Sequence, residues 1–250
     1  MPVKQMTGTE REENAGSRGE PHRKGTLYGV GVGPGDPELM TLKAVRLIRE
    51  NEVIALPGEI PEKTAAYRIA VQAVPELAEK KLIPILFPMT MDRAEQQKEH
   101  ERGAEKLKRL LDTGRNVVFL TLGDPSIYST FSYVQQLVEA DGYPAEMVSG
   151  VPSFCAAAAA LDTPLAAWTE PLHVIPAAHR LREPLDQPGT YVLMKSGSRM
   201  KEVKDLLRKT GHTAKMVQNC GMPGEKKYQS LEEIPDDAGY FSLILARRGN

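Results

Sequence analysis

Short apolar runs alternate with amphipathic stretches along most of the chain. From Thr26 onward, runs such as Val-Val-Phe-Leu at 117–120 are each followed by a stretch in which apolar positions recur every three or four residues. The first pattern is typical of buried strands, and the second of helices that pack through one face. Their alternation predicts an α/β fold in which helices connect the strands.

These patterns give each expected element its position. The predicted strands are 27–32, 53–56, 116–122, 172–175, 191–194, 215–218 and 241–246. The predicted helices are 38–50, 63–73, 94–111, 130–140, 153–161 and 199–209. Residues 156–160 are all Ala, so that helix presents small side chains suited to close packing or to the approach of a ligand.

Turn residues cluster at 141–144, Asp-Gly-Tyr-Pro, and a second series of strands begins there. We therefore expect two α/β lobes, 25–143 and 144–250, with a cleft between them. Residues 1–24 are polar and charged and almost free of large apolar side chains. That composition predicts a disordered N-terminal arm.

Charge and cysteine content exclude several classes of protein. The formal net charge of the 250 residues is −1, so a global basic field for nucleic acid is absent. Cys155 and Cys220 form no CxxC pair and have no matching His cluster, which argues against zinc and a disulfide framework. No run reaches membrane-spanning length and the start lacks the apolar core of a signal peptide, so we expect a cytoplasmic protein.

The tripeptide Gly-Asp-Pro occurs twice, at 35–37 and 123–125, each time between an apolar run and a helix-like stretch. Asp is a preferred helix N-cap and Pro suits the first helical position, so each copy can be a simple connection. Alternatively, the exposed N–H groups and the helix dipole receive a polar part of a ligand. The presence of two such loops favours ligand binding.

Familiar site motifs are missing around these loops. Counted from Gly29 or Gly31, the last glycine of GxGxxG falls at Pro34 or Asp36, so the dinucleotide fingerprint fails. The sequence has no GK[ST], HExxH or GxSxG motif. Further turns follow strands at 148–154, 194–199 and 219–224, and loops at strand carboxyl ends converge on one site in open α/β sheets. The sequence therefore predicts a ligand held largely by backbone.

Taken in order, these loops resemble those of the tetrapyrrole methylases, two-lobed class III methyltransferases that use S-adenosylmethionine. The resemblance spans 25–248 and is carried by 31–37, 122–128, 149–153 and 194–195. It implies an active site in the cleft between the lobes, and a homodimer.

Three stretches, 87–92, 121–133 and 192–195, resemble the branch of this family that methylates carbon 20 of precorrin-2 or of cobalt-factor II in cobalamin biosynthesis. The implied products are precorrin-3A or cobalt-factor III, with S-adenosylhomocysteine. The attacked carbon is enamine-like and needs no strong base, and the catalytic residue is unknown. The candidates for a base are Tyr128, Tyr133, His173 and Asp124.

The resemblance also implies binding residues. The implied cofactor contacts are Pro34, Leu122, Gly123, Asp124, Ile127, Pro152, Ser153, Met194 and Cys220. The implied substrate contacts are Met89, Thr90, Tyr128 and Lys195. Because the substrate carries eight carboxylates, basic side chains are expected in the cleft. The candidates are Lys195, Arg199, Arg68, Arg180 and Arg182.

Other readings stay open at this point. The enzyme could methylate another ring position or a diphthamide precursor, although the segment 87–92 argues against both. A protein that only sequesters a tetrapyrrole or a nucleotide is a different class. The sequence does not distinguish metal-free precorrin-2 from its cobalt complex, because the substrate carries that metal.

Overall fold

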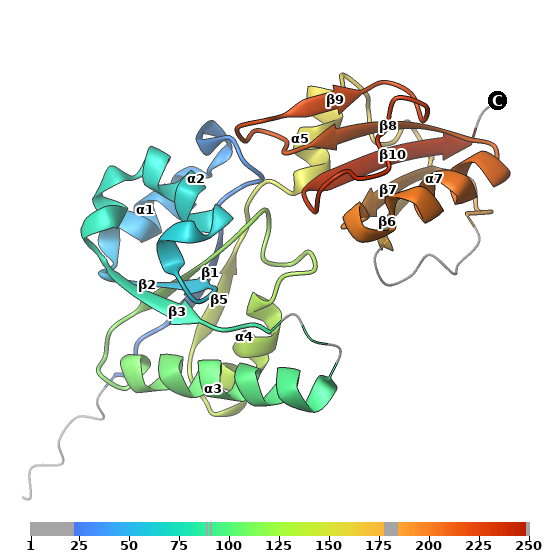
Figure 1. Cartoon of the computed structure of the whole chain (residues 1–250). Helices are drawn as coiled ribbons and strands as arrows, with labels where there is room; N and C mark the ends of the chain where they lie inside the picture. Colours follow the sequence, from blue (N-terminus) through green and yellow to red (C-terminus); the bar gives the residue numbers. More distant parts are fainter. Residues whose placement is uncertain (1–22, 89, 91, 178–184, 249–250) are drawn as a thin grey trace, which may run out of the picture.

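Two sheets of five strands each organise the protein in the computed structural model, which describes residues 23–88, 90, 92–177 and 185–248. Figure 1 shows the sheets in two lobes, each with helices packed against it. The predicted arm at 1–24 lies outside the described residues except for its last two.

The first sheet is parallel throughout its pairings and has the strand order β3-β2-β4-β1-β5. Its strands are β1 (Leu27–Gly31), β2 (Val53–Pro57), β3 (Lys81–Ile85), β4 (Val117–Thr121) and β5 (Ala145–Val148). The fully buried β4 lies near the middle of the order. The carboxyl ends of all these strands therefore meet along one edge.

Helices cover both faces of this sheet. They are α1 (Leu42–Glu50), α2 (Ala65–Ala73), α3 (Arg93–Leu111) and α4 (Phe131–Ala140), with the short 3-10 helices η1 (Pro37–Leu39), η2 (Pro61–Lys63) and η3 (Pro75–Glu79). Val118 and Leu120 pack in the core beneath α1 and α2, whereas Val117 and Phe119 pack in the core beneath α3 and α4. This alternation follows from the two-residue period of a strand.

The second sheet is mixed and has the order β6-β7-β10-β8-β9. Its strands are β6 (Leu172–Pro176), β7 (Thr190–Met194), β8 (His212–Gln218), β9 (Lys226–Tyr228) and β10 (Ser242–Arg248). β6 runs parallel to β7, whereas β10 runs antiparallel to both of its neighbours. The carboxyl ends of β7 and β8 therefore lie beside the amino end of β10.

Among the described residues, α5 (Ser153–Ala160) and α7 (Met200–Lys209) enclose this second sheet, and the 3-10 helix η4 (Gly197–Arg199) precedes α7. α5 packs on one face through Phe154 and Ala157, against Val192 and Leu245. α7 packs on the other face. The all-Ala segment of α5 is thus largely a packing surface.

Every predicted strand and helix is present, with end shifts of a few residues. The predicted helix 38–50 is two elements, η1 and α1, because Thr41 caps a new helix by accepting a hydrogen bond from the Ala44 N–H. The strands β3, β5 and β9 were not predicted. All three are sheet edges, where half-exposed strands lack the continuous apolar run of a central strand.

The predicted lobe boundary after Tyr143 does not follow the strand pairing. β5 begins at Ala145 and pairs with β1, so this strand belongs to the first sheet. α5, which follows β5, packs on the second sheet. We therefore propose that the chain passes from one lobe to the other at 149–152.

Candidate functional site

The loops after β1 and β4 lie side by side, as expected for neighbouring parallel strands. The Gly33 N–H donates to the Gly123 carbonyl at 3.3 Å, and the Gly123 N–H donates to the Gly33 carbonyl at 2.8 Å. From β1 the chain leads to α1 and β2 on one side, while β5 lies on the other. Ligands of open α/β sheets bind at such a switch of direction.

Glycines let three backbone segments touch at this edge. A Cβ added at Gly31 would lie 2.4 Å from the Gly123 carbonyl oxygen, and one added at Gly150 would lie 2.2 Å from the same atom. Both distances are far below ordinary contact, so no other residue fits without moving the backbone. The loops therefore meet as bare main chain.

The Asp124 carboxylate is occupied by hydrogen bonds within this structure. One oxygen accepts the Ser126 N–H at 2.8 Å, and the other accepts the Gly150 N–H at 2.9 Å. Asp124 is only 7% exposed. Its side chain thus ties the loop after β4 to the segment that leads into α5.

The two Gly-Asp-Pro copies therefore differ. Asp36 caps η1 by accepting the Glu38 N–H at 2.9 Å, as the capping interpretation predicts. The capping interpretation does not hold for the second copy, since α4 begins only at Phe131, close to the predicted helix start at 130. Asp124 instead shapes an extended loop between β4 and α4.

A pocket of about 460 Å³ lies where these loops meet the second lobe. This volume is within the range of roughly 300–1,000 Å³ typical of small-molecule sites. All nine predicted cofactor residues line it, and so do two of the predicted substrate residues. Those lining residues are Pro34, Leu122, Gly123, Asp124, Ile127, Pro152, Ser153, Met194, Cys220, Tyr128 and Lys195.

Some predicted residues are not brought to this pocket. Thr90 does not line it, and the Thr90 hydroxyl accepts a hydrogen bond from the Asp92 N–H at 3.2 Å. Met89 lies outside the described residues. Tyr133 and His173, two candidates for a base, do not line it either.

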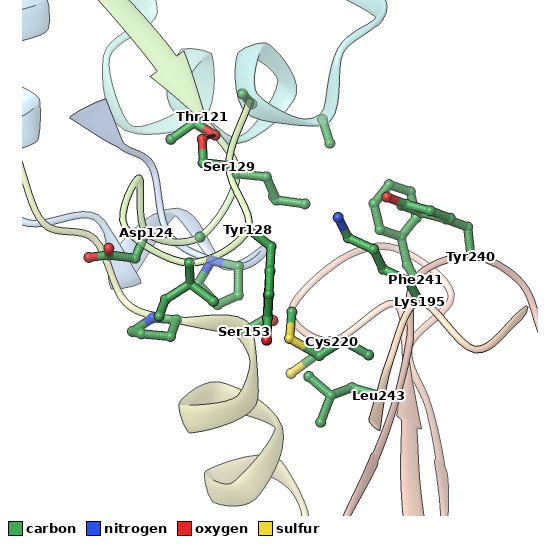
Figure 2. Close-up of a pocket in the computed structure, with 18 of the residues that line it drawn as sticks. Thr121, Asp124, Tyr128, Ser129, Ser153, Lys195, Cys220, Tyr240, Phe241 and Leu243 are labelled. Atoms are coloured by element: carbon green, nitrogen blue, oxygen red, sulfur yellow. Dashed lines mark hydrogen bonds between the residues drawn. The ribbon is translucent and has the colours of Figure 1, made fainter. Parts of the chain in front are cut away.

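Lys195 stands out among the expected basic residues. Within the described residues, no hydrogen bond or ion pair engages its ammonium group, and Figure 2 shows that group pointing into the space between the lobes. Burial lowers the pKa of Lys195. Arg199 instead pairs with Glu202, and Arg68 does not line the pocket. Arg180 and Arg182 lie outside the described residues.

Tyr128 connects the two lobes across the pocket. Its hydroxyl donates to the Val174 carbonyl of β6 at 2.9 Å, so this hydroxyl already has a partner. Tyr128, Lys195 and Asn219 all have positive φ angles, of 48°, 59° and 52°. Such backbone conformations are costly for residues other than glycine and cluster at functional sites.

Cys220 lines the pocket as a neutral thiol. Burial raises the pKa of Cys220 to about 11, so the thiolate that would act as a nucleophile is not formed near neutral pH. Among the residues that the structure describes, no group of three His, Cys, Asp or Glu is arranged to hold a metal ion. The described helices also include none with the length and apolarity to cross a membrane.

Several lining residues were not predicted from the sequence. Pro57 is the last residue of β2, and its position at the end of a predicted strand could have indicated it. Phe87 follows β3, which was not predicted, so no strand end indicated it. Tyr240, Phe241 and Leu243 lie at the amino end of β10. Loops at strand carboxyl ends are expected to converge on a site, but an antiparallel strand can bring its amino end there instead, and the sequence does not reveal this.

Comparisons with known proteins give consistent results. The family model described as Tetrapyrrole (Corrin/Porphyrin) Methylases matches residues 26–235. A probable cobalt-precorrin-2 C(20)-methyltransferase from Methanocaldococcus jannaschii is 33% identical over 89% of this chain and 96% of its own length. The cobalt-precorrin-2 C(20)-methyltransferase of Salmonella typhimurium is also 33% identical, over 90% of this chain and 97% of its own length.

The solved structures agree with these sequence relatives. The uroporphyrin-III-C-methyltransferase of Thermus thermophilus matches with a TM-score of 0.65 and 25% identity, covering 90% of this chain and 92% of that chain. The expected α/β fold of this type is confirmed.

Proposed function

The chain belongs to the tetrapyrrole methylase family, and from this premise we propose that it methylates carbon 20 of precorrin-2 or of cobalt-factor II. The methyl donor is S-adenosylmethionine. The products are precorrin-3A or cobalt-factor III, together with S-adenosylhomocysteine, in cobalamin biosynthesis. The observation that carries the proposal is the similarity to C(20)-methyltransferases along nearly their full length.

The pocket fits S-adenosylmethionine in its chemistry. Gly123 has no side chain, and a Cβ there would point toward Ser153, with its nearest atom the Ser153 nitrogen at 3.8 Å. Ser153 is the first residue of α5, so its N–H has no partner within the helix and is available to a ligand. Main-chain groups on this side can therefore bind a polar ligand without help from side chains.

We assign the two ends of the cofactor to the two lobes. In the first lobe, the amino-acid part would lie along Pro34, Gly123 and Asp124, with Leu122 and Ile127 beside them. The Asp124 contact is through backbone, because its carboxylate is already bonded to Gly150 and Ser126.

The adenosine part would lie against residues at the carboxyl ends of β7 and β8 and at the start of α5. The residues proposed for it are Pro152, Ser153, Met194 and Cys220. Pro152 supplies no hydroxyl and no N–H, so recognition there is by shape and apolar contact. The apolar side chains of Met194 and of the nearby Leu243 suit a flat heterocycle.

Lys195 and Tyr128 are the proposed substrate contacts that line the pocket. The Lys195 ammonium group has no partner among the described residues and would donate a charge-assisted hydrogen bond to a peripheral carboxylate. The Tyr128 hydroxyl is bonded to Val174, so its contact with substrate would come from the ring. The role of Met89 stays a prediction, and the position of Thr90 does not support one.

The main catalytic task of these residues is to orient two reactants. The sulfonium group of S-adenosylmethionine already activates the methyl group for transfer, so the protein needs to supply no nucleophile of its own. Orientation alone contributes up to about 7–11 kcal/mol in ideal systems. Both carboxylate oxygens of Asp124 already accept hydrogen bonds, so this side chain holds the loop after β4 in place. The cytoplasmic location and the homodimer also stay predictions.

The proposal is tested by incubating the protein anaerobically with S-adenosylmethionine and either precorrin-2 or its cobalt complex. We expect one of the two tetrapyrroles to gain the mass that corresponds to replacing one hydrogen by a methyl group. NMR should locate that methyl group at carbon 20. Comparing the two substrates identifies the preferred one. Methylation at another carbon, or no methylation of either substrate, would refute the proposal.

A further inference from the structure

Two large aromatic side chains stand half-exposed at the edge of the pocket. Tyr240 is 52% exposed and Phe241 is 41% exposed, and both line the pocket. Their rings meet edge to face, with centroids 5.3 Å apart. Aromatic rings left in solvent around a concave site commonly provide contact area for a ligand.

The backbone beneath these rings is held on several sides. The Asn219 N–H donates to the Phe241 carbonyl at 2.9 Å, and the Ser242 hydroxyl donates to the Gly239 carbonyl at 2.7 Å. A Cβ added at Gly197 would lie 2.8 Å from that same Gly239 carbonyl oxygen, so η4 packs tightly against the segment. The rings are therefore exposed on a well-anchored support.

Strand register places Lys195 at the same end of the sheet. Leu243 of β10 pairs with Met194 of β7, so the residues before Leu243 and those after Met194 lie together beyond this pair. In Figure 2, Tyr240, Phe241 and Lys195 are grouped on one side of the pocket, and Ser153 lies away from them. The aromatic pair thus adjoins the Lys195 ammonium group and is separate from the start of α5.

We propose that Tyr240 and Phe241 form an aromatic wall that contacts the conjugated ring system of the tetrapyrrole, while Lys195 binds one of its carboxylates. This inference rests on the proposed function and assigns the substrate side of the same pocket. A flat, polyanionic macrocycle needs apolar contact for its face and positive charge at its rim. The aromatic wall and Lys195 supply both from adjacent positions.

The test compares binding of the two ligands in Tyr240→Ala and Phe241→Ala. Precorrin-2, or its cobalt complex where the unaltered protein prefers it, is titrated anaerobically by absorbance, and S-adenosylhomocysteine is titrated by calorimetry. We expect each variant to bind the tetrapyrrole about tenfold more weakly, the scale of one lost aromatic contact. The affinity for S-adenosylhomocysteine should stay within about twofold. In turnover, KM for the tetrapyrrole should rise and kcat should change little, because the contact stabilises the bound substrate and the transition state equally.

Two further variants sharpen the result. Phe241→Tyr keeps a ring and should retain nearly full affinity for the tetrapyrrole. Trp168→Ala removes a fully exposed aromatic ring of the same lobe that does not line the pocket, and it should leave both affinities unchanged.

The outcomes separate the two proposals. If the unaltered protein binds neither precorrin-2 nor its cobalt complex, both the function and the aromatic wall are overturned. If the unaltered protein binds one of them and both Ala variants bind it equally well, only the aromatic wall is overturned. A loss confined to S-adenosylhomocysteine would place the rings on the cofactor instead.

Discussion

At the scale of single residues, Lys195 differs from an ordinary surface lysine in three respects. It has a left-handed backbone, it has no polar partner among the described residues, and burial lowers its pKa. Each of these features is unfavourable in the protein alone. A carboxylate of the bound substrate would stabilise the ammonium charge and so replace the hydration that burial removes. Substrate binding would thus offset the unfavourable features of Lys195.

Because of Lys195, substrate binding should weaken as the pH rises into the alkaline range. Only the ammonium form pairs with carboxylate, and the lowered pKa means that this form is lost at a lower pH than in an exposed lysine. KM for the tetrapyrrole should therefore rise on the alkaline side. In Lys195→Gln, KM should be raised at neutral pH by roughly ten- to a hundredfold, the scale of a charge-assisted hydrogen bond.

Lys195→Arg provides the control for that pH profile. The guanidinium stays charged at any usable pH, so the alkaline rise due to residue 195 should disappear. Tyr128 and Tyr240 are unchanged in both proteins, so the difference between the two profiles reports Lys195 alone. Identical profiles would show that Lys195 does not meet the substrate.

Gly123 allows a second test at this scale, with Gly142 as its matched control. Their φ angles are 71° and 72°, so Ala at either position should cost about 1–2 kcal/mol in free energy of unfolding. A Cβ at Gly142 has nothing within 4 Å, whereas one at Gly123 points toward Ser153. Calorimetry should show at least about tenfold weaker binding of S-adenosylhomocysteine in Gly123→Ala only.

Equal affinity in the two glycine variants would remove the loop after β4 from the cofactor site.

The residues of this loop were predictable because they follow a buried apolar run. Their individual roles were not predictable. Only the coordinates show that the Asp124 carboxylate is bonded to Gly150, 26 positions away along the chain.

At the scale of elements, two loops from different lobes pack against each other through glycine. A Cβ added at Gly35 would lie 2.2 Å from the Cys220 carbonyl oxygen, and one added at Gly221 would lie 2.5 Å from the Asp36 nitrogen. The loop before η1 and the loop after β8 thus meet without intervening side chains. The position of Cys220 beside the pocket depends on this contact.

Gly221→Ala should disturb that contact, and Gly211→Ala is its control. Both glycines have φ near 70°, and a Cβ at Gly211 meets nothing within 4 Å. Gly221→Ala should lose about 1–3 kcal/mol more in free energy of unfolding, the usual cost of overpacking. Denaturant unfolding measures this difference. Equal losses would show that the loops move apart freely.

Central elements were predictable because burial gives them a clear pattern. The five residues of β4 are all buried, and its helical neighbours begin at recognisable caps such as Thr64 and Asp92. Edge strands were not predictable in the same way. β9 has the sequence Lys-Lys-Tyr and gains its strand geometry from pairing with β8, which no local pattern reveals.

At the scale of the whole molecule, the site combines a parallel sheet with a mixed one. Convergence of strand carboxyl ends holds for the first lobe and for β7 and β8 of the second. It fails for β10, which runs antiparallel and brings Tyr240 and Phe241 to the pocket by its amino end. The order and direction of strands depend on contacts between residues distant in sequence. The position of Tyr240 and Phe241 at the pocket could therefore not be predicted from the sequence.

The meeting of bare backbones at Gly31, Gly123 and Gly150 has a consequence for how the protein tolerates mutation. Where the wall of a site is main chain, random mutagenesis should be silent at many lining side chains and damaging at these small residues. An engineer who wishes to change the accepted tetrapyrrole would then leave the three glycines fixed. The diversity of a designed library belongs at the opposite wall, where Tyr240, Phe241 and Lys195 present replaceable groups.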